Sequence, residues 1–262
     1  MDAQSGEMVD CVTRDNDTFM ESEPWESIQN PEAIYKKAQE IIKELVEKNA
    51  PITSIGITGQ MHGILYIDSH GNPLSPLYIW QDGRGDLPCG DSTYRKTLED
   101  LTKCRLATGY GMVTHFYNLK NNLVPANTST FCTIHDYVAM KLAGKTCPVM
   151  DPTDAASLGL YDIQRNCFNM MAVKAAGINP ELLPEVSPKA GVIGNTPDGI
   201  PVSIAIGDNQ ASFLGSVPSI KSSILVNIGT GSQISLYTDK FIASTPCETR
   251  PFVDNGYLLV GA

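Results

Sequence analysis

Short apolar runs alternate with helical patterns along the chain, and this alternation constrains the fold more than any other sequence feature. The runs at 52–58, 63–68 and 201–207 are rich in residues that favour strands. A helical pattern fills 30–49, where Asn30 can cap the first turn. Interleaved helices and strands of this kind predict an α/β fold.

Weaker patterns complete the expected order of elements. They predict strands at 7–14 and 77–80, helices at 92–103 and 134–144 (the second closed by Gly144), a strand–glycine turn–strand unit at 222–238, and a strand that begins at 257. The hairpin-rich tail differs in rhythm from the rest of the chain. A domain boundary near 208–215 is therefore expected.

Charge and composition narrow the class of partner. The formal net charge of −10 argues against a nucleic-acid or anionic-membrane surface, and no apolar run is long enough to span a membrane. The N-terminus carries no signal segment, so a cytoplasmic protein with small-molecule ligands is expected. The seven cysteines are scattered without a C-x-x-C pair, and no H-x-x-x-H pair occurs, so neither a disulfide framework nor a zinc site is indicated and no residue is assigned as a metal ligand.

One acid, Asp208, directly follows the apolar run 201–207 and precedes a helical stretch. An acid at this position can simply cap the helix, and position alone slightly favours that role. Ligands of open α/β sheets, however, collect at the carboxyl ends of strands. A carboxylate there can accept the proton of an alcohol that becomes a nucleophile.

Two further stretches carry polar groups after apolar runs. In "GQMHG" (59–63), glycines flank Gln60 and His62, which suits either a ligand contact or a plain turn between strands. In "WQDGRG" (80–85), Trp80, Asp82 and Arg84 alternate and share one side if the strand continues. An aromatic plate beside an acid and a guanidinium suits a polyhydroxylated ligand, although a surface ion pair beside a core Trp is equally consistent.

The stretch "NIGTGSQ" (227–233) places Gly229, Thr230 and Gly231 in a turn between strands. Exposed backbone amides in such a turn can hold phosphate oxygens, with the Thr hydroxyl as a further donor. An ordinary hairpin turn is the alternative, and the stretch is not a Walker motif.

Taken together and in order, "GITGQMHG", "WQDGR", "TIHDYVAMKLAG", "MDPTDAASLGLYD", "GDNQAS" and "NIGTGSQ" resemble the FGGY family of carbohydrate kinases. The resemblance implies an actin-like ATPase (ribonuclease H-like) fold with two α/β domains that flank a cleft. Residues 1–211 would form the sugar-binding domain without its first strands. Residues 212–262 would begin the nucleotide-binding domain.

The resemblance also implies roles for individual residues and for the ligands. Asp208 would be the catalytic base, with ATP and Mg²⁺ as cofactors and a ketose as the acceptor. The sugar site would comprise Gln60, Met61, His62, Trp80, Asp82, Arg84 and Asn209, and the nucleotide phosphates would meet Gly229, Thr230 and Gly231. We expect Asp208 to share one hollow with Trp80 and Arg84.

The choice of sugar rests on "GQMHG", "WQDGR", "ATGYG" and "TIHDY", which are most similar to family members that phosphorylate sedoheptulose. Xylulose or another ketose is an alternative, and so is a non-catalytic sugar-binding or regulatory role. The sequence departs from the family because it has no Asp-x-Gly-Thr-Thr loop and stops at "YLLVGA". We therefore expect a chain truncated at both ends, with little phosphoryl transfer of its own.

Overall fold

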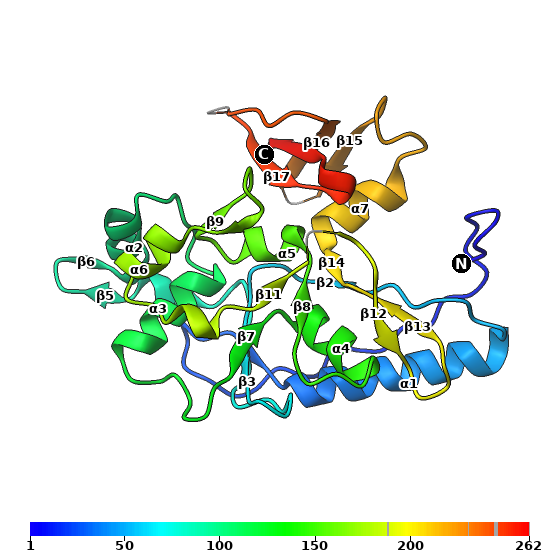
Figure 1. The fold of residues 1–262 in the computed structure, drawn as a ribbon, viewed down its shortest axis with the longest axis horizontal. Helices are drawn as coiled ribbons and strands as arrows, with labels where there is room; N and C mark the ends of the chain where they lie inside the picture. Colours follow the sequence, from blue (N-terminus) through cyan, green and yellow to red (C-terminus); the bar gives the residue numbers. More distant parts are fainter. Residues whose placement is uncertain (188, 230, 244–245, 262) are drawn as a thin grey trace.

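The computed structural model describes residues 1–187, 189–229, 231–243 and 246–261. Figure 1 shows a larger body of helices and short strands, with the last strands of the chain gathered in a separate sheet above it. Helix α7 (Asp208–Ser216) leads from the body to that sheet. The stretch 208–215, where a domain boundary is expected, forms part of this helix.

Six other α-helices occur among the described residues. They are α1 (Pro31–Asn49), α2 (Tyr94–Thr102), α3 (Gly111–Lys120), α4 (Ile134–Leu142), α5 (Pro152–Ser157) and α6 (Met170–Ala175). The Asn30 side chain caps α1 as predicted, because its oxygen accepts the amides of Glu32 and Ala33 at 3.0 and 3.1 Å. None of the helices described is long and apolar enough to cross a membrane.

The strands of the body form short pairs. These are β1 (Ile28–Gln29) with β4 (Leu77–Tyr78), β2 (Thr58–Gly59) with β14 (Ile206–Gly207), β3 (Leu65–Ile67) with β7 (Thr130–Cys132), β5 (Pro88–Cys89) with β6 (Ser92–Thr93), β8 (Val149–Met150) with β11 (Glu185–Val186), β9 (Tyr161–Asp162) with β10 (Cys167–Phe168), and β12 (Val192–Asn195) with β13 (Pro201–Ser203). The β2–β14 and β8–β11 pairs are parallel, and the others are antiparallel.

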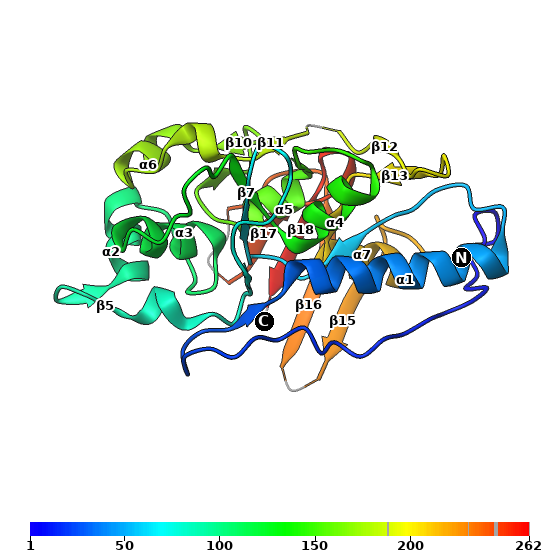
Figure 2. The same ribbon diagram turned by 90° about the horizontal axis from the view of Figure 1, so that it is seen from below.

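The tail forms a four-stranded antiparallel sheet in the order β15–β16–β18–β17. Its strands are β15 (Ile224–Ile228), β16 (Ser232–Thr238), β17 (Glu248–Pro251) and β18 (Tyr257–Gly261). Figure 2 shows β15 and β16 side by side below α7. The predicted strand–glycine turn–strand unit is thus confirmed, and so is a strand from 257.

The core of the body lies on both faces of the β3–β7 pair. Successive side chains of a strand point to opposite faces. Ile64 and Tyr66 accordingly pack into one cluster with helix α3, whereas Leu65 and Ile67 pack into a second cluster with helix α4. All four side chains are fully buried. Burial on both faces explains why the run 63–68 is almost continuously apolar.

Two strand predictions need correction. Residues 7–14 form no strand, because Met8 and Val9 are mostly exposed and have no sheet to pack against. The run 201–207 is divided into β13, which pairs antiparallel with β12, and β14, which pairs in parallel with β2. The residues between them, Ile204 and Ala205, are buried in the body.

Candidate functional site

Two parallel strands, β2 and β14, end side by side at glycines. Their register pairs Thr58 with Ile206 and Gly59 with Gly207. The next residues along the chain are Gln60–His62 after β2 and Asp208–Gln210 after β14. Because the carboxyl ends of parallel strands meet at one edge, the two polar segments emerge next to each other. The structure therefore brings together the "GQMHG" and "GDNQAS" motifs.

The Asp208 side chain is free at this edge. It is the first residue of α7, and Gly207 occupies the N-cap position. Its carboxylate is exposed and makes no hydrogen bond with the described part of the chain. Asp208 is thus not the capping side chain that position alone slightly favoured. The positive end of the helix dipole still favours a carboxylate in the first turn.

Gly207 allows the two segments to approach closely. A Cβ atom at this position would lie 2.8 Å from the Met61 sulfur and 2.8 Å from Oε1 of Gln210. The Gly207 amide donates to the Thr153 hydroxyl at 3.2 Å, which ties the end of β14 to helix α5. The position of Asp208 is therefore fixed by contacts on both sides.

His62 is held in one orientation on the same edge. Its φ of 74° is rare for a residue with a side chain. Its Nδ1 donates to the Ser157 carbonyl at 2.7 Å, so Nε2 is the acceptor of the neutral ring. The ring stacks on Tyr110 with centroids 4.6 Å apart and planes 5° apart. Burial lowers the pKa of His62, which keeps the ring neutral at physiological pH.

A cavity of about 630 Å³ opens beside these residues. Met61, His62, Tyr110 and Gln210 line its side on the body, and β17 with Glu248 and Arg250 lines the other side. A cavity of this size suits a small-molecule ligand. Sequence reasoning missed Tyr110, although "ATGYG" contains it, and it missed the charges in "CETRPF", which sit in an otherwise ordinary strand.

The other predicted sugar residues on the body lie elsewhere. Gln60 donates to the Gln29 side chain at 2.9 Å and lines a second hollow of about 590 Å³ with Trp80. Trp80 is 53% exposed. The expectation that Asp208, Trp80 and Arg84 share one hollow is wrong, because β4 already ends at Tyr78 and the chain turns away.

Asp82 and Arg84 form a buried ion pair with 0% and 1% exposure. Nε and Nη2 of Arg84 donate to the two Asp82 oxygens at 2.6 and 3.1 Å, and Nη1 donates to Asn118 at 2.6 Å. The Asp82 carboxylate also accepts the Ser27 amide at 3.1 Å. With their polar groups engaged inside the protein, these two side chains do not reach a sugar, which corrects the predicted contact.

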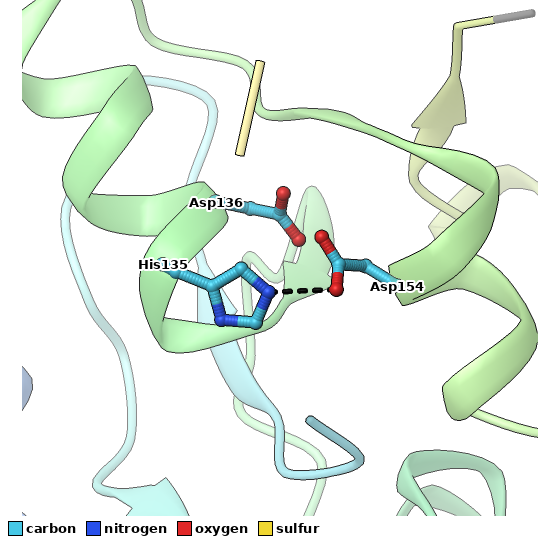
Figure 3. A group of neighbouring side chains, drawn as sticks. All are labelled: His135, Asp136 and Asp154. Atoms are coloured by element: carbon cyan, nitrogen blue, oxygen red, sulfur yellow. Dashed lines mark ion pairs between the residues drawn. The ribbon is translucent and has the colours of Figure 1, made fainter. Parts of the chain in front are cut away.

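Figure 3 shows a second buried cluster, in which His135 and Asp136 of α4 face Asp154 of α5. His135 Nε2 lies 2.7 Å from the nearer Asp154 oxygen. Two ligands of a tetrahedral metal ion stand about 3.3 Å apart for bonds of about 2.0 Å. The 2.7 Å separation of this ion pair is shorter than that, so a metal ion would have to push the two side chains apart.

The cluster supports the site from beneath. Burial raises the pKa of Asp136 and of Asp154 and lowers that of His135, so the carboxyl groups tend to retain protons. The His135 ring packs against Gly59, where an added Cβ would lie 3.0 Å from the histidine Cβ. Helices α4 and α5 thus hold both glycine ends of the β2–β14 pair.

The predicted nucleotide residues lie in the turn between β15 and β16. The Gly229 amide donates to the Gly231 carbonyl at 2.8 Å, so this amide is already engaged. Thr230 lies outside the described residues. Asn209, the remaining predicted residue, has a side-chain oxygen that is buried and has no hydrogen-bond partner in the described structure.

Comparison with known proteins identifies relatives. The sequence model for the FGGY family of carbohydrate kinases, N-terminal domain, matches residues 1–215. Sedoheptulokinase from Mus musculus is 31% identical over 245 residues, covering 80% of this chain and 50% of the relative. Sedoheptulokinase from Homo sapiens is 30% identical, covering 76% of this chain and 46% of the relative. The chain spans about half the length of these curated relatives.

Solved structures of sugar kinases share the fold. A ligand-bound xylulose kinase from Lactobacillus acidophilus superimposes with a TM-score of 0.80 at 19% identity, over 92% of this chain and 52% of that one. Plasmodium falciparum glycerol kinase with ADP gives 0.76 at 23% identity, over 93% and 54%. The expected actin-like α/β fold is therefore confirmed.

Proposed function

Because the chain belongs to the FGGY family of carbohydrate kinases, we propose that it takes part in phosphoryl transfer from ATP to the terminal hydroxyl of a ketose. The ketose is sedoheptulose and the product sedoheptulose 7-phosphate. Similarity to the two mammalian sedoheptulokinases supports this choice of sugar. Residues 1–211 are the sugar-binding domain in this proposal, and 212–262 begin the nucleotide-binding domain.

The observation that carries the proposal is the in-register end of β2 and β14. It places the free carboxylate of Asp208 next to the Met61–His62 segment, at the edge where ligands of such sheets bind. Phosphoryl transfer needs alignment and charge stabilisation more than covalent help from the protein. In this proposal Asp208 accepts the proton of the sugar hydroxyl while the hydroxyl oxygen attacks the γ-phosphorus of ATP. The bond from the γ-phosphorus to the β,γ-bridging oxygen breaks, and ADP leaves.

The same edge carries oxygens that suit Mg²⁺. The exposed Asp208 carboxylate and the unpartnered Asn209 side-chain oxygen are hard ligands of the kind this ion prefers. When bound, Mg²⁺ would offset the negative charge of the ATP phosphates. Gly229, Thr230 and Gly231 remain the proposed phosphate contacts, with the Gly231 amide as a donor.

The assignment of the base is tested by Asp208→Asn in the full-length protein. We expect kcat to fall about 10²–10⁴-fold, the usual contribution of a general base, with the KM for sugar changed only a few-fold. Coupled detection of ADP measures both constants. Asp198→Asn, an exposed acid in the turn before β13, is the matched control. An unchanged kcat in Asp208→Asn would contradict the proposed base.

Sugar identity and the non-catalytic alternative need separate measurements. A panel of sedoheptulose, xylulose and glycerol with the full-length protein distinguishes the three acceptors. We also propose that this 262-residue chain transfers phosphate slowly by itself, since its sequence holds no Asp-x-Gly-Thr-Thr segment. Calorimetry with sugar and with Mg·ATP separately tests this, because sugar binding without nucleotide binding or turnover would support a purely sugar-binding role.

A further inference from the structure

We infer that Arg250 and Glu248, on β17, bind the hydroxyl groups at the far end of the sugar and so select the length of the ketose. This inference rests on the proposed kinase function and adds to it a part of the site that discriminates between acceptors. It concerns a different wall of the cavity from the one that carries the "GQMHG" motif.

The lining of the cavity places this pair away from the reacting end. Met61 and Gln210 line the cavity and both lie against Gly207, the residue that precedes Asp208. His62 and Tyr110, which stack on each other, line the same cavity as Glu248 and Arg250. A sugar whose terminal hydroxyl is at Asp208 extends past His62 toward Arg250 and Tyr110.

The hydrogen bonds within the pair leave groups available to a ligand. Nε and Nη2 of Arg250 both donate to a single Glu248 oxygen, Oε2, at 2.9 and 2.7 Å. Nη1 of Arg250 and Oε1 of Glu248 have no protein partner among the residues described. The pair thus presents a donor beside an acceptor, and neighbouring sugar hydroxyls each donate and accept.

The exposure of the pair points to binding rather than to stability. The Arg250 side chain is 21% exposed and that of Glu248 is 51% exposed. Solvated ion pairs contribute little to folding, so this pair is free to exchange water for a ligand. The opposite wall is held in place by the stack of His62 on Tyr110 and by the hydrogen bonds between His62 and Ser157. Discrimination by length therefore falls to β17.

The test is Arg250→Gln in the full-length protein, with kcat and KM measured for xylulose and for sedoheptulose. A hydrogen bond to a charged group contributes about ten-fold to a hundred-fold in affinity. We expect the KM for sedoheptulose to rise by about that factor. The KM for xylulose should stay within about two-fold, because the five-carbon chain ends short of Arg250. Glu248→Gln, which keeps an acceptor oxygen, should give a smaller rise with the same dependence on length.

Arg165→Gln is the matched control. Arg165 is an exposed arginine paired with Asp162, and it does not line the cavity. Equal changes for both sugars in Arg250→Gln, or none, would overturn the inference while leaving the kinase function intact. A wild-type protein that phosphorylates no ketose would overturn both. A wild-type preference for a sugar acid, lost in Arg250→Gln, would overturn the assignment of the pair to ketose hydroxyls.

Discussion

The molecule contains two acid–arginine pairs with the same two-residue spacing in opposite surroundings. Asp82–Arg84 lies inside the body, with almost no solvent exposure, whereas Glu248–Arg250 lies on the cavity wall of the tail sheet. The first pair is bonded on every side, and the second keeps a donor and an acceptor unused. The comparison shows that burial, rather than the residue pattern, decides whether such a pair holds the fold or is free to bind a ligand.

The buried pair is one end of a longer network. Arg84 donates to Asn118, the Asn118 amide donates to the Tyr66 hydroxyl at 3.2 Å, and that hydroxyl meets Nδ1 of His115 at 2.9 Å. The Arg84 guanidinium also stacks over the Tyr78 ring, 4.0 Å from its centre. Connected buried polar groups stabilise one another, so loss of one member leaves its neighbours buried without a hydrogen-bond partner.

The largest expected difference between the pairs is in stability. Asp82→Ala leaves the Arg84 charge buried without its main partner and should lower the free energy of unfolding by about 3–5 kcal/mol. Urea denaturation followed by circular dichroism measures this loss. A loss below about 1 kcal/mol would show that Asn118 and Glu26 are sufficient to hold Arg84, and the contrast with the exposed pair would then fail.

A second difference is in the response to pH. Burial lowers the pKa of His115 to about 4, whereas the unfolded chain takes up this proton near pH 6.5. The unfolded state thus binds more protons between pH 6.5 and pH 4, and the network loses stability as the pH falls through that window. At pH 5 the loss attributable to His115 should be about 2 kcal/mol.

The comparison of wild type with His115→Gln isolates this effect. Other titrating groups, including Asp136 and Asp154, are present in both proteins and cancel in the difference. The stability gap between the two proteins should narrow by about 2 kcal/mol between pH 7.5 and pH 5. A constant gap would mean that His115 titrates normally and that water reaches the network.

The smallest effect is expected at the exposed pair. Glu248→Ala should change the free energy of unfolding by less than about 1 kcal/mol, and by less still in high salt, because solvated ion pairs are weak and screened. Denaturation at low and high ionic strength measures both values. A loss as large as that of Asp82→Ala would mean that β17 depends on the pair for its structure.

Much of the candidate edge was predictable from the sequence. The apolar runs 52–58 and 201–207 each lead into a polar segment at a glycine. When two such strands pair in parallel, these segments lie at the same edge. In the structure, Met61 and His62 follow β2 and Asp208 follows β14 at this edge. Helix α1 was also predictable, because its cap and its periodicity are local properties.

The role of "WQDGR" could not be predicted in the same way. Alternation of Trp80, Asp82 and Arg84 suggested one exposed face, but that reading required the strand to continue past Tyr78. Instead Asp82 caps a short 3-10 turn, Gly83–Asp86, which turns Arg84 into the core. The contacts that fix this turn come from Ser27 and Asn118, which are distant in sequence. For the same reason, nothing local showed that Arg250 faces His62 across a cavity.

The position of Trp25 beside the buried pair determines which part of the protein tryptophan fluorescence reports. Trp25 and Trp80 are the only two tryptophans in the sequence, and Trp25 lies 5.7 Å from the Arg84 guanidinium. Tryptophan fluorescence therefore reports on the body and not on the tail sheet that carries Arg250. A thermal unfolding curve recorded by tryptophan emission alone would follow the cavity wall on the body and not the wall on the tail sheet. A tryptophan introduced at Tyr257, in β18, would supply the missing signal.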